Sequence, residues 1–140
     1  GHFDAGDYSK YTINSALMIH ALTFATDHLP GVDAIDNLGL PESGDGLPDA
    51  LQIAVWEADF LRKMQDADGG FSFLVYPRDR PYELDVLPEN GDPQVLFPKT
   101  TAATAAAVGA LAQLAASPVL CRHDPRRAEE YLHAAREGYA

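Results

Sequence analysis

Two kinds of segment alternate along the chain: some have apolar residues every three or four positions, and others are rich in Gly, Pro and Asp. The first periodic segment covers residues 12–28, and Pro30 and Gly31 follow it, as they commonly follow a helix. The second covers residues 48–67, begins with a proline that suits a first helical turn, and stops before Gly69. The pattern therefore predicts two helices, over 12–28 and 48–67. The positions of the two stripes are Ile13, Ala16, Leu17, His20, Leu22 and Phe24 in the first, and Leu51, Ala54, Val55, Ala58, Leu61 and Met64 in the second.

Two further helices are predicted in the second half of the chain. Residues 100–117 are so rich in Ala and other small residues that another helix must approach them closely. Asp124 suits the N-cap of a last helix and Pro125 its first turn, and the pattern continues to about residue 139. Its inward positions are predicted to be Ala128, Tyr131, Leu132 and Ala135.

The middle of the chain has a different character. The segment FSFLVY, at residues 71–76, alternates weakly and is rich in aromatic residues, which predicts a strand. Residues 77–98 contain five prolines and are predicted to form a long irregular loop, which is uncommon unless it has a function. Helix, long loop and helix, twice over, are typical of stacked helical hairpins. We predict an all-α fold of about four helices with a long Pro-rich loop.

Composition excludes several classes of partner. The formal net charge is −11 and the ten basic residues form no patch, so neither nucleic acid nor a membrane surface is an expected partner. Cys121 is the single cysteine, so the chain can form neither an internal disulfide nor a Cys-based zinc site. No apolar run is long enough to span a membrane, and no signal peptide opens the sequence. Because Gly1 leads directly into an acidic motif, we expect the 140 residues to be a segment of a longer protein.

The acidic motif is FDAGDYSKY, at residues 3–11, in which Asp4 and Asp7 lie three residues apart around Gly6. One interpretation is structural: Asp7 caps the following helix and Asp4 is solvated. The other is chemical: the short turn presents both carboxylates to one cavity, where they activate water. The spacing does not fit an EF-hand loop. Both interpretations remain open from the spacing alone.

Four ordered blocks resemble glycoside hydrolase family 9, the inverting cellulases. GHFDAGDYSKYTIN, at residues 1–14, resembles the family's DAGD signature, although His2 and Phe3 depart from its commoner order. LPESGDGLPDALQIAVWEADFLRKMQ, at residues 40–65, and the DGG at 68–70 resemble the next two blocks. FPKTTAATAAAVGALAQLA, at residues 97–115, resembles a helix of members that carry an N-terminal immunoglobulin-like module. The likeness covers residues 1–117.

The resemblance implies a fold, an activity and two catalytic residues. The fold would be part of an (α/α)6 barrel, with residues 1–140 a single partial domain from the N-terminal portion of the catalytic barrel. The activity would be hydrolysis of β-1,4 bonds in a glucan such as cellulose, with inversion, in a secreted or periplasmic enzyme. Asp7 would be the general base and Asp4 the second acid that holds the attacking water. No cofactor is implied for this chemistry, and the substrate-binding residues stay unknown.

The resemblance also implies that the general acid lies elsewhere. The family's acid is a Glu that follows an Asn, far towards the C-terminal end of the catalytic domain. None of the seven Glu residues in this chain follows an Asn. We therefore expect the acid to lie in the remainder of the parent catalytic domain, which would be a necessary partner of this segment.

A second acidic cluster comprises Glu42, Asp45 and Asp49. Three carboxylates among flexible glycines offer oxygen ligands of the kind that calcium prefers, and relatives in the resembled family often bind calcium. The alternative is a solvated loop in which Asp45 or Asp49 favours the start of the following helix. The cluster is thus a candidate structural calcium site.

Other polar and aromatic residues are interpreted mainly as structural. His20 is predicted to be a core histidine with a hydrogen-bond partner, and Trp56 a packing residue rather than a sugar platform. Phe71, Phe73 and Tyr76 could line a glycan cleft or pack under the long loop. A non-catalytic helical module that binds a glycan or calcium is the alternative function, whereas a polysaccharide lyase, which uses a Tyr, His or Lys base, fits the acidic pair poorly.

Overall fold

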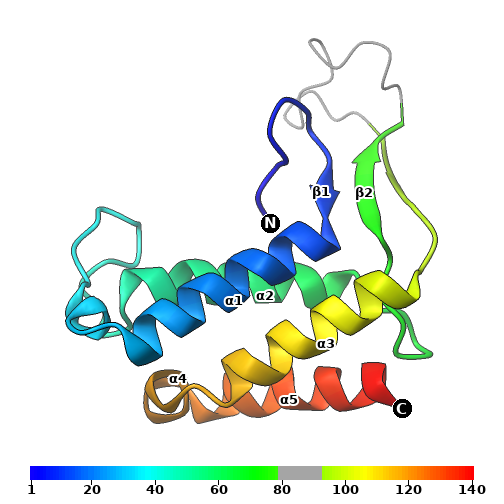
Figure 1. Ribbon diagram of the computed structural model, residues 1–140. Helices are drawn as coiled ribbons and strands as arrows, with labels where there is room; N and C mark the ends of the chain where they lie inside the picture. Colours follow the sequence, from blue (N-terminus) through cyan, green and yellow to red (C-terminus); the bar gives the residue numbers. More distant parts are fainter. Residues whose placement is uncertain (79–92) are drawn as a thin grey trace.

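The computed structural model describes residues 1–78 and 93–140, and its described part is dominated by helices (Figure 1). Helix α1 packs against α2 and α3, and α3 packs against α5. The strands extend beyond one end of the helices, where the N-terminal loop also lies. In chain order the elements are β1 (Lys10–Tyr11), α1 (Thr12–His28), the 3-10 helix η1 (Val32–Ala34), α2 (Asp49–Lys63), β2 (Leu74–Pro77), β3 (Gln94–Leu96), α3 (Thr101–Ala115), α4 (Pro118–His123) and α5 (Pro125–Tyr139).

The four predicted helices are present, and α2 and α3 have changed ends. Helix α1 has the predicted bounds, whereas α2 begins one residue after Pro48 and ends at Lys63. The short α4 was not predicted; Ser117 caps it, accepting a hydrogen bond from Leu120 N, and Pro118 stands in its first turn. Asp124 caps α5 as predicted, since its carboxylate accepts a hydrogen bond from Arg127 N at 3.0 Å. Among the described residues, no helix has the length and apolar content that a membrane span needs.

Small residues allow α3 to lie between two other helices. Ala103, Ala107 and Ala110 are buried on α3, and α1 and α5 both contact this helix. The predicted close approach of another helix to residues 100–117 is therefore confirmed. Thr100 caps α3, with its hydroxyl accepting a hydrogen bond from Ala103 N at 3.1 Å.

Helix α1 buries a mainly polar side and exposes an apolar one. The apolar side chains of Ile13, Leu17 and Phe24 are 36%, 66% and 49% exposed. The buried residues of α1 are Thr12, Ser15, Ala16, Ile19, Thr23 and Thr26. The apolar stripe seen in the sequence is therefore mostly not the side that packs against α2 and α3.

A small antiparallel sheet joins the N-terminal loop to the middle of the chain. Strand β2 lies between β1 and β3, with Lys10 opposite Val75 and Val75 opposite Leu96. The predicted strand over 71–76 is thus shifted to Leu74–Pro77, and Phe71 and Ser72 form isolated bridges. Part of the predicted 77–98 loop is strand as well, and residues 79–92 of that loop lie outside the described residues.

Two of the aromatic residues predicted to line a cleft or to pack, Phe71 and Phe73, have different surroundings. Phe71 is fully buried in the core, which supports the packing interpretation for this residue. Phe73 is half-buried, with its ring 5.7 Å from the Tyr11 ring and 5.9 Å from the Phe97 ring.

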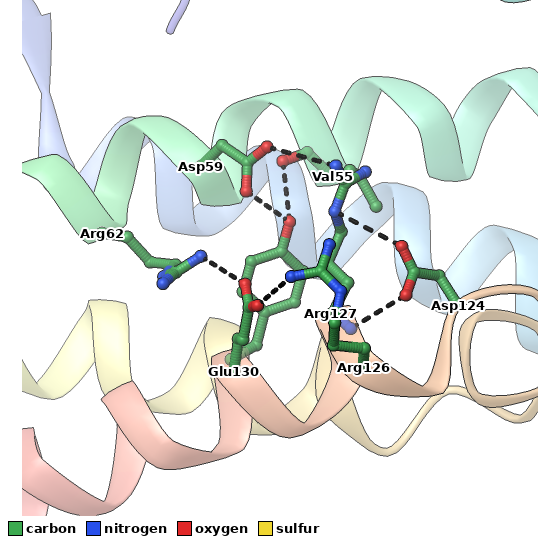
Figure 2. A network of polar contacts seen from close by, with 8 residues as sticks. Val55, Asp59, Arg62, Asp124, Arg126, Arg127 and Glu130 are labelled. Carbon is green, nitrogen blue, oxygen red and sulfur yellow. Dashed lines mark hydrogen bonds and ion pairs between the residues drawn. The ribbon is translucent and has the colours of Figure 1, made fainter.

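A polar network links α2 to α5 (Figure 2). The Tyr131 hydroxyl lies 2.8 Å from Asp59 Oδ1 and 3.2 Å from the Val55 carbonyl oxygen. Burial and then the hydrogen bond to Asp59 raise the pKa of Tyr131 far above its usual value, so this phenol stays protonated and donates. Glu130 on α5 accepts a hydrogen bond from Arg62 on α2 at 2.8 Å.

The turn that follows α2 touches the end of α5 through two glycines. Gly69 has a φ of +85°, and a Cβ there would lie 2.2 Å from the Glu137 carbonyl oxygen. A Cβ on Gly138 would lie 3.1 Å from the Gly69 carbonyl oxygen. The Gln65 side-chain amide donates to the carbonyl oxygens of Gly69 and Ala134, which holds the turn against α5.

We therefore expect Gly69→Ala to destabilise the protein by more than its backbone conformation explains. Gly31→Ala is the matched control, because Gly31 has a φ of +83° and nothing within 4 Å of its Cβ position. The left-handed conformation alone costs about 1–2 kcal/mol for a non-glycine residue. Thermal unfolding should show a larger fall in melting temperature for Gly69→Ala than for Gly31→Ala. Equal falls would show that the turn can move away from α5.

Candidate active site

The N-terminal loop is closed by its own backbone and by the side chain of Asp7. Asp4 N donates to the Ser9 carbonyl oxygen at 2.8 Å, and Gly6 turns the chain with a φ of +84°. Ser9 N donates to Asp7 Oδ1 at 2.6 Å, so the loop fixes one oxygen of this carboxylate. The predicted short turn around Gly6 is therefore present, and Asp4 and Asp7 both lie on it.

Asp7 does not cap α1, so the structural interpretation of this residue is wrong. The N-cap of α1 is Tyr11, which makes no side-chain capping bond. The first turn instead bonds to the segment that precedes β2: Thr12 N donates to the Phe73 carbonyl oxygen at 3.0 Å, and the Thr12 hydroxyl donates to the Ser72 carbonyl oxygen at 2.6 Å. The first backbone N–H of α1 therefore bonds to backbone, and Asp7 Oδ1 accepts its hydrogen bond from Ser9 N within the loop.

Asp4 is half-buried beside the first turn of α1. Its Oδ1 accepts a hydrogen bond from the Asn14 amide at 3.1 Å, so Asp4 is not simply solvated. It also lines a small cavity of about 110 Å³. Asp7 is not among the residues that line this cavity. The lining residues are His2, Phe3, Asp4, Tyr11, Asn14, Ser15, Met18 and Glu57.

Glu57 is a buried carboxylate that the sequence analysis did not single out. It lies on α2, is 1% exposed, and accepts hydrogen bonds from His2 and Ser15. A glutamate in the middle of an apolar stripe could have been noted as unusual. Its partners could not have been found, because they lie 42 and 55 residues away in the sequence.

Aromatic rings and Lys10 support the outer part of the loop. The Lys10 ammonium lies 4.6 Å from the centre of the Phe3 ring and 5.7 Å from that of Phe60 on α2. Phe3 packs edge to face with Tyr8 at 5.4 Å between ring centres. Such contacts between a cation and aromatic faces are attractive, and here they join the loop to α2.

The residues of the second acidic cluster do not come together. Asp49 is the first residue of α2 and is buried; its Oδ2 accepts hydrogen bonds from Leu38 N at 2.5 Å and from the Ser43 hydroxyl at 2.8 Å. Asp45 Oδ1 accepts from Leu47 N, and Glu42 is exposed. Within residues 1–78 and 93–140 no group of three His, Cys, Asp or Glu side chains could hold a metal ion.

Asp36, which the sequence analysis missed, organises this loop instead. Its two carboxylate oxygens accept hydrogen bonds from Gly44 N at 2.6 Å and Gly46 N at 2.8 Å. These two backbone donors lower the pKa of Asp36 below its usual range. Asp49 Oδ1 is buried without a hydrogen-bond donor among the described residues. The acidic residues thus brace the loop and the start of α2.

One structural prediction about a single side chain is partly wrong. His20 is exposed rather than part of the core, although its Nδ1 has a partner, Gln113 Oε1, at 2.5 Å. Trp56 is 51% exposed, and its ring packs edge to face against the His2 ring at 4.7 Å between ring centres. Trp56 and His2 line a cavity of about 420 Å³, together with Gln52, Asp59 and Arg127 among others.

The helices pack as stacked hairpins, and a loop with two carboxylates precedes the first helix. This arrangement is expected for part of a helical-barrel glycoside hydrolase. The family model for glycosyl hydrolase family 9 matches residues 1–140, so the chain belongs to this family. The fold predicted from the resemblance, part of an (α/α)6 barrel, is also confirmed by similarity to solved structures of the family.

The similar proteins are all much longer than this chain. Endoglucanase D of Acetivibrio thermocellus is 31% identical over 140 residues, which cover 99% of this chain and 22% of that protein. A metagenome-derived glycoside hydrolase family 9 endoglucanase is 32% identical with a TM-score of 0.84, covering 99% of this chain and 25% of that one. AaCel9A, solved in complex with cellobiose-like isofagomine, is 34% identical with a TM-score of 0.79, covering 99% of this chain and 26% of that one.

A structural calcium ion at residues 42–49 stays a prediction, and it can be tested by melting curves. An ion held only by the folded state would raise the melting temperature, and a chelator would reverse the rise. If Glu42, Asp45 and Asp49 bind the ion, Asp45→Ala should abolish the rise, while Asp33→Ala, an exposed control, should keep it. Identical curves in calcium and chelator would leave these carboxylates only the bracing role described above.

Proposed function

We propose that this chain is part of the catalytic domain of an inverting glycoside hydrolase that cleaves β-1,4 bonds in a glucan. The proposal rests on membership of glycosyl hydrolase family 9 and on similarity to proteins named as endoglucanases. A glucan substrate is supported by the complex of the similar AaCel9A with cellobiose-like isofagomine. Because the family resemblance implies a secreted or periplasmic enzyme, the proposal also places the parent protein outside the cytoplasm.

The observation that carries the proposal is the conformation of the N-terminal loop around DAGD, residues 4–7, which is called the DAGD loop below. Asp7 makes no capping bond to α1, and the half-buried Asp4 lines a small cavity. Here both carboxylates belong to a closed turn that precedes α1.

In the proposed reaction, Asp7 is the general base and Asp4 helps to hold the water. Asp7 takes a proton from the water as its oxygen bonds to the anomeric carbon, and the bond from that carbon to the glycosidic oxygen breaks. A carboxylic acid on the opposite face protonates the leaving oxygen, and attack from the opposite side inverts the configuration. The base and the acid of inverting enzymes stand about 6.5–9.5 Å apart, which leaves room for the water.

The acid is proposed to come from protein outside this segment. Inverting catalysis needs one carboxyl group on each face of the sugar, and Asp4 and Asp7, on one short loop, both serve the water side. The exposed apolar side of α1, formed by Ile13, Leu17 and Phe24, supports a further layer of helices that covers it in a complete barrel.

In the full-length enzyme, Asp7→Asn should lower kcat by about 10²–10⁴-fold, the usual worth of general-base assistance. The asparagine oxygen can still accept from Ser9 N, so the melting temperature should hardly change. Asp4→Asn should also be severe, because the water loses one of its two carboxylate partners. The exposed Asp33→Asn is the matched control and should keep full activity. Near-normal turnover by Asp7→Asn on a soluble β-glucan would contradict the assignment.

Azide gives a second test of the same assignment. A small anion can occupy the space left in Asp7→Gly and attack the anomeric carbon in place of activated water. Azide should therefore restore turnover to Asp7→Gly and leave Asp33→Gly unaffected. A failure to restore turnover, together with an active Asp7→Asn, would favour a non-catalytic module.

The isolated 140-residue chain should not hydrolyse soluble β-glucan and should self-associate through its exposed apolar side of α1. Light scattering and a reducing-sugar assay measure the two properties. Replacing Leu17 and Phe24 by Gln should reduce self-association without producing any hydrolysis. A monodisperse, active preparation of the unaltered chain would overturn the proposal that further protein completes the site.

A further inference from the structure

The buried carboxylate of Glu57 joins three separate segments beneath the DAGD loop. Glu57 belongs to α2, His2 to the N-terminal loop and Ser15 to α1. Glu57 Oε2 accepts hydrogen bonds from His2 N at 3.0 Å and His2 Nδ1 at 2.7 Å, and Oε1 accepts from the Ser15 hydroxyl at 2.5 Å. The three hydrogen bonds use both carboxylate oxygens, and Glu57 is only 1% exposed to solvent.

The contact also orients the His2 ring. A carboxylate only accepts hydrogen bonds, so the proton on this side of the imidazole must be on Nδ1. The ring then stands edge to face against Trp56, the neighbour of Glu57 on α2. Backbone and ring of His2 are therefore both held by α2, two residues before Asp4.

Two short paths lead from Glu57 to Asp4. One runs through His2 and Phe3 to Asp4 along the loop backbone. The other runs through Ser15, whose neighbour Asn14 donates its side-chain amide to Asp4 Oδ1 at 3.1 Å. Glu57 and Asp4 also line the same cavity of about 110 Å³. Both paths end on the carboxylate that is proposed to hold the water.

Packing alone does not explain a carboxylate at this position. Burial of a charged group is unfavourable unless it is paired and hydrogen-bonded, and an apolar side chain of similar size would fill the same space without that penalty. The neighbouring buried residues of α2, Ala54, Ala58 and Leu61, are apolar. The hydrogen bonds to His2 and Ser15 are what the carboxylate adds.

We propose that Glu57 is a positioning residue for catalysis: through His2 and Ser15 it fixes the loop so that Asp4 and Asp7 meet the attacking water. This inference rests on the proposed function of the two aspartates. Glu57 itself touches neither substrate nor water in the reaction. Misplacement of reacting groups by about 1 Å, caused from a distance, can cost about 10²-fold in rate.

The test compares Glu57→Leu and Glu57→Gln in the full-length enzyme. Leucine removes all three hydrogen bonds. Glutamine can keep them, since its carbonyl oxygen can accept from both His2 donors while its amide donates to the Ser15 hydroxyl, which also accepts. We expect kcat to fall about 10²-fold in Glu57→Leu with KM nearly unchanged, and to recover towards the wild-type value in Glu57→Gln.

The control is Tyr131→Phe, which removes a buried hydroxyl between α5 and α2, on residues outside the loop. It should lower the melting temperature while kcat per folded molecule stays at the wild-type value. Wild-type kcat in Glu57→Leu, or equal loss of kcat in Glu57→Leu and Tyr131→Phe, would overturn the inference. If Glu57→Leu does not fold, His2→Phe replaces it; this variant keeps a ring against Trp56 but loses the Nδ1 bond, and a wild-type kcat there would overturn the inference.

Asp7→Asn is measured in the same series, so that two failures can be told apart. An inactive Asp7→Asn beside a fully active Glu57→Leu overturns the positioning role and leaves the proposed function standing. An active Asp7→Asn overturns the proposed function and the inference with it.

Discussion

The arrangement of the N-terminal third of this chain depends on one buried carboxylate. Removing a charged group from water is costly, by several kcal/mol per ion even after the protein relaxes, unless hydrogen bonds compensate. Glu57 finds its donors on His2 and Ser15, so α2, α1 and the loop must come together in one geometry. Without these hydrogen bonds, α1, α2 and the loop would lose a contact that fixes their relative positions. The carboxylate therefore selects one relative placement rather than simply adding stability.

The buried hydroxyls of α1 have several partners, of which Glu57 is one. Ser15 must reach Glu57, and Thr12 must reach the Ser72 carbonyl oxygen, so both hydroxyls are on the buried side. The Thr26 hydroxyl donates to the Leu22 carbonyl oxygen of its own helix. With the inward side occupied by hydroxyls, the larger apolar residues Leu17 and Phe24 are left on the outer side. A helix of this kind buries apolar surface on both sides only within a larger assembly of helices.

Local signals in the sequence predicted local structure well. The caps and first turns at Asp124 and Pro125 were read correctly, because a cap depends on residues within one turn of each other. The small residues of 100–117 predicted close helix packing for a similar reason, since Ala at the contact permits it whatever the partner. The motif around Gly6 likewise located the closed turn that carries Asp4 and Asp7.

Features that depend on distant partners were not predictable in this way. Asp36 looked like one acid among many in a Gly-rich loop, and only the fold shows its bonds to Gly44 N and Gly46 N. Trp56 was predicted to be a packing residue, but only the fold shows that its packing partner is the His2 ring, from a distant segment of the chain. The three carboxylates at 42–49 predict one calcium site from spacing, and only the fold shows that Asp49 accepts hydrogen bonds from Leu38 N and the Ser43 hydroxyl. A pattern of residue types cannot show such directions.

The distinction between local and distant partners also applies to the proposed chemistry. The water-side carboxylates of an inverting hydrolase act on one molecule of water from one face, so two residues of a single short turn can supply both. Asp4 and Asp7 satisfy that condition within four residues. The acid must lie on the other face of the sugar, about 6.5–9.5 Å from the base. A turn of this size cannot extend around a glucan chain to place it there. In the proposed mechanism, the two water-side carboxylates can therefore be found in a local motif. The general acid comes from a distant part of the barrel and cannot be found in this way. In our proposal, the position of Asp4 and Asp7 then depends on the hydrogen bonds between Glu57 and His2.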